Sequence, residues 1–174
     1  MVTAIVLGAI AFLLLIYASW TAKRLDRLHA RVDAAAAALD AQLRARGEAV
    51  TKFVAEGHAS PTVAAELERA AAAVAGVSGL GHDRESAENE LSRVLTATDG
   101  ELALTGGGYA VADAATRASF ARRFHNDAVR DVLVVRRRRV VRYLRLAGRA
   151  ALPSYFEMVE PAMSGTPASV SSGE

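Results

Sequence analysis

Histidine is the residue type in this chain best suited to metal binding and acid–base catalysis, but its copies are widely separated. A di-iron site in a helical bundle uses Glu-x-x-His motifs on facing helices, and zinc needs closely spaced ligands such as His-x-x-x-His. Neither spacing occurs, and no Ser or Thr stands in the strand–turn–helix context of a catalytic nucleophile. The four histidines are His29, His58, His82 and His125. The sequence therefore predicts a protein that is not an enzyme and has no metal site or cofactor.

Three consecutive glycines at 106–108 precede a predicted helix, and the N-terminus of a helix is a place where phosphate binds. The stretch lacks the preceding strand, the spaced glycines and the lysine of a P-loop. We therefore interpret it as a flexible loop between helices.

Asn126 and Asp127 lie in the last long helical stretch, beside the apolar residues Phe124 and Ala128, which we expect to face inward. A polar side chain that flanks a buried face can pair with a neighbouring helix and fix the register of the two helices. The alternative is that both side chains are exposed to solvent, and either interpretation is structural. The candidate partners on the first helix are Asp40, Gln42 and Arg44.

An arginine-rich run follows on the same helix. Ten arginines between residues 122 and 149 stand against Asp127 and Asp131, a net charge of +8. The whole chain carries +2, so the rest of it carries −6, and pairing within the molecule is one interpretation of the run. The candidate interaction patch consists of Arg136, Arg137, Arg138, Arg139, Arg142 and Arg145.

The same patch is also suited to binding anionic lipid, nucleic acid or an acidic protein. Nucleic acid is not the expected ligand, because Tyr143 is the only aromatic residue within 136–149. Contact of this patch with lipid is unfavourable in the expected geometry. If the chain has three long helices, the basic end of the last helix lies far from the bilayer, and only an even number of long helices would bring that end back to the bilayer. An acidic protein partner fits this expected geometry better.

Residues 2–20 are expected to lie in a bilayer, because they contain no charged residue and no histidine. A helix of this length reaches about 28 Å, close to the hydrocarbon thickness of a bilayer. Trp20 lies at its end, and four basic residues follow by residue 31 without any before the run. We expect an uncleaved, single-pass anchor in the cell membrane, with the N-terminus outside and the rest of the chain in the cytoplasm.

The remaining sequence has the three- and four-residue spacing of amphipathic helices. The first predicted helix covers residues 23–56, and its alanine-rich, coiled-coil-like seam includes Leu39, Arg46 and Phe53. Two pieces at 61–76 and 83–98, separated by a glycine-rich break or kink, form an antiparallel return. The last helix covers about 110–148, and its expected buried face carries Phe120, Phe124, Ala128, Val132 and Val135.

These elements predict an all-α protein: an N-terminal transmembrane helix followed by an antiparallel up-and-down bundle of three to four long helices. The expected domains are the anchor at 1–22 and the helical bundle at 23–157. The Ser-, Gly- and Pro-rich remainder, 158–174, is expected to be a disordered tail.

Three stretches of the sequence resemble the LemA family. They are 32–46, 88–95 and 121–130, and the ending Pro153-Ser154-Tyr155-Phe156-Glu157 is also similar to that family. The resemblance implies a membrane-anchored antiparallel helical bundle with no established enzymatic activity. It supplies no catalytic residue.

We therefore expect a non-catalytic scaffold or interaction module that is held in a lipid bilayer by residues 2–20. Its expected partner is another protein or a second copy of the chain. The alternative is a basic domain that binds anionic lipid or nucleic acid through Arg136–Arg149. The two are distinguished by whether these arginines are paired within the fold or form an exposed patch.

Overall fold

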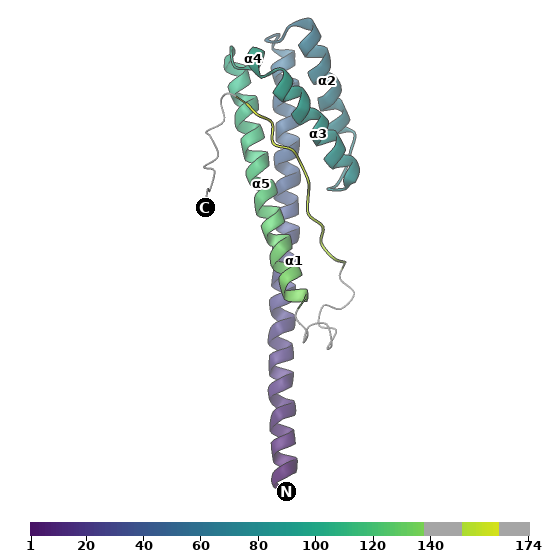
Figure 1. The fold of residues 1–174 in the computed structure, drawn as a ribbon, viewed down its shortest axis with the longest axis vertical. Helices are drawn as coiled ribbons and strands as arrows, with labels where there is room; N and C mark the ends of the chain where they lie inside the picture. The colour runs from purple at the N-terminus through teal and green to yellow at the C-terminus, as the bar shows by residue number, and fades with distance from the viewer. Residues whose placement is uncertain (138–150, 164–174) are drawn as a thin grey trace. The chain divides into compact units, whose positions relative to one another are not determined.

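The computed structural model describes residues 1–137 and 151–163, and within these residues the chain is helical, with no strand (Figure 1). This confirms the predicted all-α fold. The helices are α1 (Val2–Ala55), α2 (Pro61–Ala75), α3 (His82–Ala97), α4 (Asp99–Leu102) and α5 (Gly106–Arg136).

The chain divides into two compact units, and the long helices α1 and α5 each contribute to both. Unit 1 contains residues 1–35 together with the described residues of 125–155. Unit 2 contains residues 36–124 together with the described residues from 156 onward.

Unit 2 is an up-and-down arrangement in which α1, α2, α3 and α5 alternate in direction (Figure 1). Pro61 occupies the start of α2, where its missing N–H costs no hydrogen bond.

The segment 76–81, which was expected to be a break or kink in a helix, reverses the direction of the chain between α2 and α3. Gly79 has φ of 79°, a left-handed conformation that glycine adopts without the penalty of a Cβ. Within the described residues the bundle therefore has four long helices, the upper number of the predicted three to four.

The core of unit 2 is built from small and medium apolar side chains, as the alanine-rich composition requires. Leu67 and Val74 of α2 and Leu91 and Leu95 of α3 are buried in one cluster with Phe53 of α1. Alanines of α2 and α5 complete this cluster, and their small size permits close packing of the helices.

The three glycines at 106–108 are not a loop: they form the first turn of α5. A Cβ at Gly108 would lie 1.9 Å from the carbonyl oxygen of Leu102. A Cβ at Gly107 would lie 2.9 Å from Cδ2 of His58 and 3.0 Å from Cδ2 of Phe53. Gly107 and Gly108 are therefore required for close packing rather than for flexibility.

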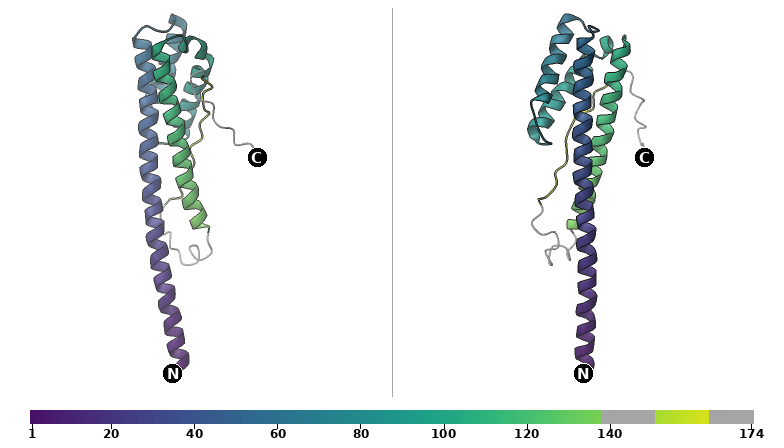
Figure 2. Two further views of the ribbon diagram at one scale, coloured as in Figure 1. Left: turned by 90° about the vertical axis from the view of Figure 1, so that its left-hand side faces the viewer. Right: turned by 180° about the vertical axis from the view of Figure 1, so that it is seen from behind.

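Unit 1 is an antiparallel pair formed by the earlier part of α1 and the later part of α5, which lie side by side in the left-hand view of Figure 2. Leu25 packs with Val135, whereas Val32 packs with a cluster that includes Val129 and Val132. Residue numbers thus rise along one helix as they fall along the other.

The expected buried face of the last helix is wrong at two positions. The side chains of Phe120 and Phe124 are 53% and 66% exposed, whereas Ala118, His125 and Val132 are buried. These three recur every seven residues, so the buried row passes along the other side of the helix from the two phenylalanines. The described part of this helix ends at Arg136, and the expected extension to 148 lies outside the described residues.

Residues 158–163 do not form part of a disordered tail, contrary to the expectation. Residues 156–163, here called the strap, are extended, and Phe156, Met158 and Met163 are buried. Backbone N–H groups of the strap donate to side chains of α3. These bonds are Glu157 N to Glu85 Oε1 (2.8 Å), Val159 N to Asn89 Oδ1 (2.7 Å) and Ala162 N to Thr96 Oγ1 (3.2 Å).

Among the described residues, α1 is the one helix that is long and apolar enough to cross a membrane. An 18-residue window near its N-terminus has a mean hydropathy of 2.4, and none of that window is buried within the protein. By length and composition, this part of the helix is able to span a bilayer.

Candidate functional site

The most unusual group in unit 2 is a carboxylate held between two guanidinium groups in the interior. Arg46 and Glu88 are 0% exposed and Arg84 is 2% exposed. Nε of Arg84 donates to Oε1 of Glu88 at 2.9 Å, and Nη1 of Arg46 lies 3.7 Å from Oε2 of the same carboxylate. Charges buried this completely are stable only when paired, so Glu88 is the counter-charge for two cations.

Further polar contacts connect α1, α3 and the segment that precedes α3. Nη2 of Arg46 donates to Oγ of Ser92 at 2.8 Å, and Nη1 of Arg84 donates to the carbonyl oxygen of Val77 at 2.9 Å. Nη1 of Arg84 also lies 3.7 Å from Oδ1 of Asp40, which accepts a hydrogen bond at its other oxygen from Arg44. We call Asp40, Arg44, Arg46, Arg84 and Glu88 the ionic cluster.

The ionic cluster carries a net charge of +1, since three guanidinium groups face two carboxylates. Burial raises the pKa of Glu88, while the nearby guanidinium groups of Arg46 and Arg84 act in the opposite direction. Burial also lowers the pKa of Arg46, and Glu88 opposes that change. Each charge in the centre therefore depends on its neighbours to remain charged.

Arg46 was predicted in the apolar seam of the first helix, but its partners were not predicted. Leu25, Val32, Leu39, Arg46 and Phe53 recur every seven residues, and all five are buried. An arginine at such a position requires a buried acid on a facing helix. The sequence signal that could have identified this acid is the pair Arg84 and Glu88, which are four residues apart on α3.

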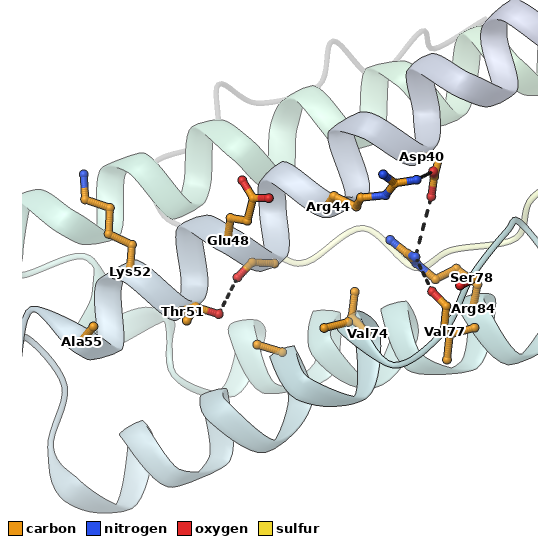
Figure 3. A pocket seen from close by; sticks show the side chains of 13 residues that line it. Asp40, Arg44, Glu48, Thr51, Lys52, Ala55, Val74, Val77, Ser78 and Arg84 are labelled. Atoms are coloured by element: carbon orange, nitrogen blue, oxygen red, sulfur yellow. Dashed lines mark hydrogen bonds and ion pairs between the residues drawn. The ribbon is translucent and has the colours of Figure 1, made fainter.

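Beside the ionic cluster, a groove of about 540 Å³ runs between α1 and α2 (Figure 3). Its floor is made of small side chains, including Gly47, Ala71 and Ala75, and Arg84 lies at one end. Charged side chains form the α1 rim. They are Arg44, Glu48 and Lys52.

The residues predicted to fix helix register have different surroundings. Asp40 bonds to Arg44 of its own helix and pairs with Arg84 of α3, so it does connect two helices. Asp127 is exposed and pairs with Arg130 of its own helix at 3.0 Å. Gln42 and Asn126 are half-buried. The pairing of Asn126 or Asp127 with the first helix stays a prediction.

Of the four histidines, His125 of unit 1 is the buried one. Its Nε2 lies 3.4 Å from the carbonyl oxygen of Ser154, and burial lowers its pKa below the ordinary value despite that contact. Within residues 1–137 and 151–163, no three His, Asp or Glu side chains form a group that could hold a metal ion.

The arginine-rich run begins close to the residues that follow the apolar stretch, which corrects the expected geometry. Because Val135 packs on Leu25, Arg136 and Arg137 lie near the first basic residues of α1. Arg137 is exposed, and Nη1 of Arg136 donates to the carbonyl oxygen of Ala151 at 3.1 Å. The remaining patch residues, Arg138, Arg139, Arg142 and Arg145, lie outside the described residues.

The basic side chains of unit 1 next to the contact between Leu25 and Val135 follow shortly after Trp20, over whose ring the guanidinium carbon of Arg24 lies at 5.8 Å. We call them the basic collar. Its members are Lys23, Arg24, Arg27, Arg136 and Arg137.

Comparison with known proteins gives no significant match: no family model matches the chain, and no curated protein or solved structure does.

Proposed function

We propose that this chain is a single-pass membrane protein whose helical module is non-catalytic, and whose basic collar binds the headgroups of anionic lipids. The observation that carries the proposal is the packing of Val135 on Leu25. Since Leu25 follows the candidate span by five residues, this contact keeps Arg136 and Arg137 near the bilayer surface.

The electrostatics favour an anionic surface. Each Lys or Arg close to an anionic leaflet contributes about 1 kcal/mol to the attraction. With Asp26 counted against its five basic members, the basic collar has a net charge of +4 and an attraction of about 4 kcal/mol. A tryptophan at the end of the span favours the headgroup layer as well.

The orientation belongs to the same proposal. Basic residues follow the apolar stretch and none precedes it, which favours an outside N-terminus and a cytoplasmic module. The chain has no cysteine, so a single Glu68→Cys substitution on exposed α2 provides a unique label. A membrane-impermeant maleimide should label this variant only after the cells are opened. Labelling in intact cells would contradict the orientation.

The resemblance to the LemA family supports the same assignment, because that family implies an anchored helical bundle with no established enzymatic activity. A protein-docking scaffold is the second candidate function, and the groove between α1 and α2 favours it.

Trp20 is the only tryptophan of the chain and lies beside the basic collar, so it can report on the neighbouring lipids. The full chain is reconstituted in phosphatidylcholine vesicles that contain a trace of dansyl-labelled phosphatidylserine or dansyl-labelled phosphatidylcholine. Energy transfer from Trp20 should be stronger to the anionic label, and added salt should reduce the difference.

The Arg136→Ser/Arg137→Ser double variant should lose a large part of this preference. The matched control is Arg93→Ser/Arg117→Ser, which removes the same charge from exposed ion pairs of unit 2 and should keep the preference. Equal transfer to the two labels at low salt would refute lipid binding by the basic collar.

A further inference from the structure

We infer that the groove between α1 and α2 is a docking site for a helix of another protein, one that carries an acidic, a basic and an acidic residue at four-residue intervals. This site lies in unit 2 and is independent of the basic collar, which lies in unit 1.

The dimensions of the groove suit a helix. Its α1 wall extends from Asp40 to Ala55, fifteen residue steps, or about 22 Å along the helix axis. The floor has little side-chain volume. A Cβ at Gly47 would make only an ordinary contact, 3.8 Å from Cγ1 of Val74. A floor of this kind allows the backbone of a partner helix to approach closely, as in helix-in-groove recognition.

The rim specifies the charges of the partner. Arg44, Glu48 and Lys52 follow one another at four-residue intervals on α1, so their charges alternate along one face. The complementary helix carries acid, base and acid at the same intervals. This pattern reads the same in both directions, so it matches the rim for a parallel or an antiparallel partner.

A second observation at the end of the groove points to an anion. Nη2 of the buried Arg84 has no hydrogen-bond acceptor within the described residues, and Figure 3 shows this guanidinium group facing the groove. The ionic cluster to which Arg84 belongs has a net charge of +1. A carboxylate at the first acidic position of the partner would lie near Arg84 and balance this charge.

A second copy of the chain has to be distinguished by experiment. Charges alternate at four-residue intervals from Asp40 along α1 to Glu56 just after it, so antiparallel α1 helices with a two-fold axis between Arg44 and Glu48 would place unlike charges opposite each other. Analytical ultracentrifugation of the full chain in detergent should show a monomer. A dimer that is lost in the Thr51→Trp variant would overturn the assignment of this surface to a different protein.

The test uses the full chain in nanodiscs of phosphatidylcholine, so that anionic lipid plays no part in the result. The probe is a fluorescein-labelled alanine-rich peptide of about four helical turns with Glu, Lys and Glu at four-residue intervals. The control peptide carries Lys, Glu and Lys at the same positions. Fluorescence anisotropy at low salt should give about tenfold tighter binding of the first peptide.

A charge-inverted variant, Arg44→Glu/Glu48→Arg/Lys52→Glu, should reverse the preference between the two peptides. These three side chains are exposed, but Arg44 also donates to Asp40 in the ionic cluster, so far-ultraviolet circular dichroism first checks that the variant keeps the helical content of the original protein. A Thr51→Trp variant places a large side chain in the groove and should weaken the binding of both peptides. Absence of binding, equal affinity for both peptides, or an unchanged preference in the inverted variant would overturn the inference.

Discussion

Replacement of Glu88 by Gln removes the counter-charge of two buried cations while it keeps the shape of the side chain. Arg46 then has no carboxylate, and Arg84 keeps only Asp40, at 3.7 Å. Loss of one partner from a buried ion pair costs about 3–5 kcal/mol in the free energy of unfolding. For a chain of this size, about 2–4 °C of melting temperature is lost per kcal/mol, so a decrease of about 6–20 °C is expected.

Arg46→Met should cost less than Glu88→Gln. The carboxylate of Glu88 keeps its 2.9 Å bond from Arg84, and the main loss is the hydrogen bond to Ser92, which leaves that hydroxyl unpaired at about 1–3 kcal/mol. The double variant Arg46→Met/Glu88→Gln leaves no unpaired Arg46 charge. It should therefore be less destabilised than the sum of the two single variants, and the difference measures the coupling.

The assay is thermal unfolding of the full chain in detergent micelles, followed by far-ultraviolet circular dichroism. The control is Glu90→Gln on the same helix, where an exposed carboxylate bonds to Arg93 at 2.6 Å. This variant should melt at the temperature of the original protein. If Glu88→Gln shifted the melting temperature no more than the control does, the ionic cluster would not carry the stability assigned to it.

Two further predictions concern packing and pH. Gly107→Ala should lower the free energy of unfolding by about 1–3 kcal/mol, because its Cβ would lie 3.0 Å from the buried ring of Phe53. The control Gly100→Ala, whose Cβ would have no atom within 4 Å, should leave the stability unchanged. Chemical denaturation of both variants measures the two free energies. Burial lowers the pKa of His125 below the ordinary 6.5, so the unfolded chain binds that proton more readily than the folded chain. Stability should fall as the pH drops below about 6.5, and His125→Leu should remove that part of the dependence; identical pH profiles of melting temperature for the two proteins would contradict it.

Helices α2, α3 and α5 and the later part of α1 were predictable because each follows the spacing that buries one face of a helix, whereas the short helix α4 was not predicted. That spacing even placed Arg46 in the buried row, since residues on both sides of it at seven-residue intervals are apolar. It did not identify Glu88, because a pairing between helices depends on their order and direction in space. The number of long helices depended on the conformation of residues 76–81, where one left-handed glycine, Gly79, helps turn a possible kink into a reversal.

The location of the arginine-rich run depended in turn on that reversal. With three long helices the run would lie far from the bilayer, whereas with four its first described residues, Arg136 and Arg137, follow Val135, which packs on Leu25. The strap was not predictable from periodicity, because it is not helical and its backbone bonds to side chains of α3. Phe120 and Phe124 were wrongly predicted to be buried. Both are apolar, but the buried row of α5 runs along the other side of the helix.

The strap also sets an order of events during synthesis of the chain. Phe156 and Met158 pack against Leu39, Leu43 and Ala118, yet they leave the ribosome after every helix that surrounds them. Until they emerge, the nascent four-helix unit has an unfilled apolar slot along its side. Completion of this core is therefore among the last steps of folding, and a chain that stalls before residue 156 presents that slot to chaperones and proteases.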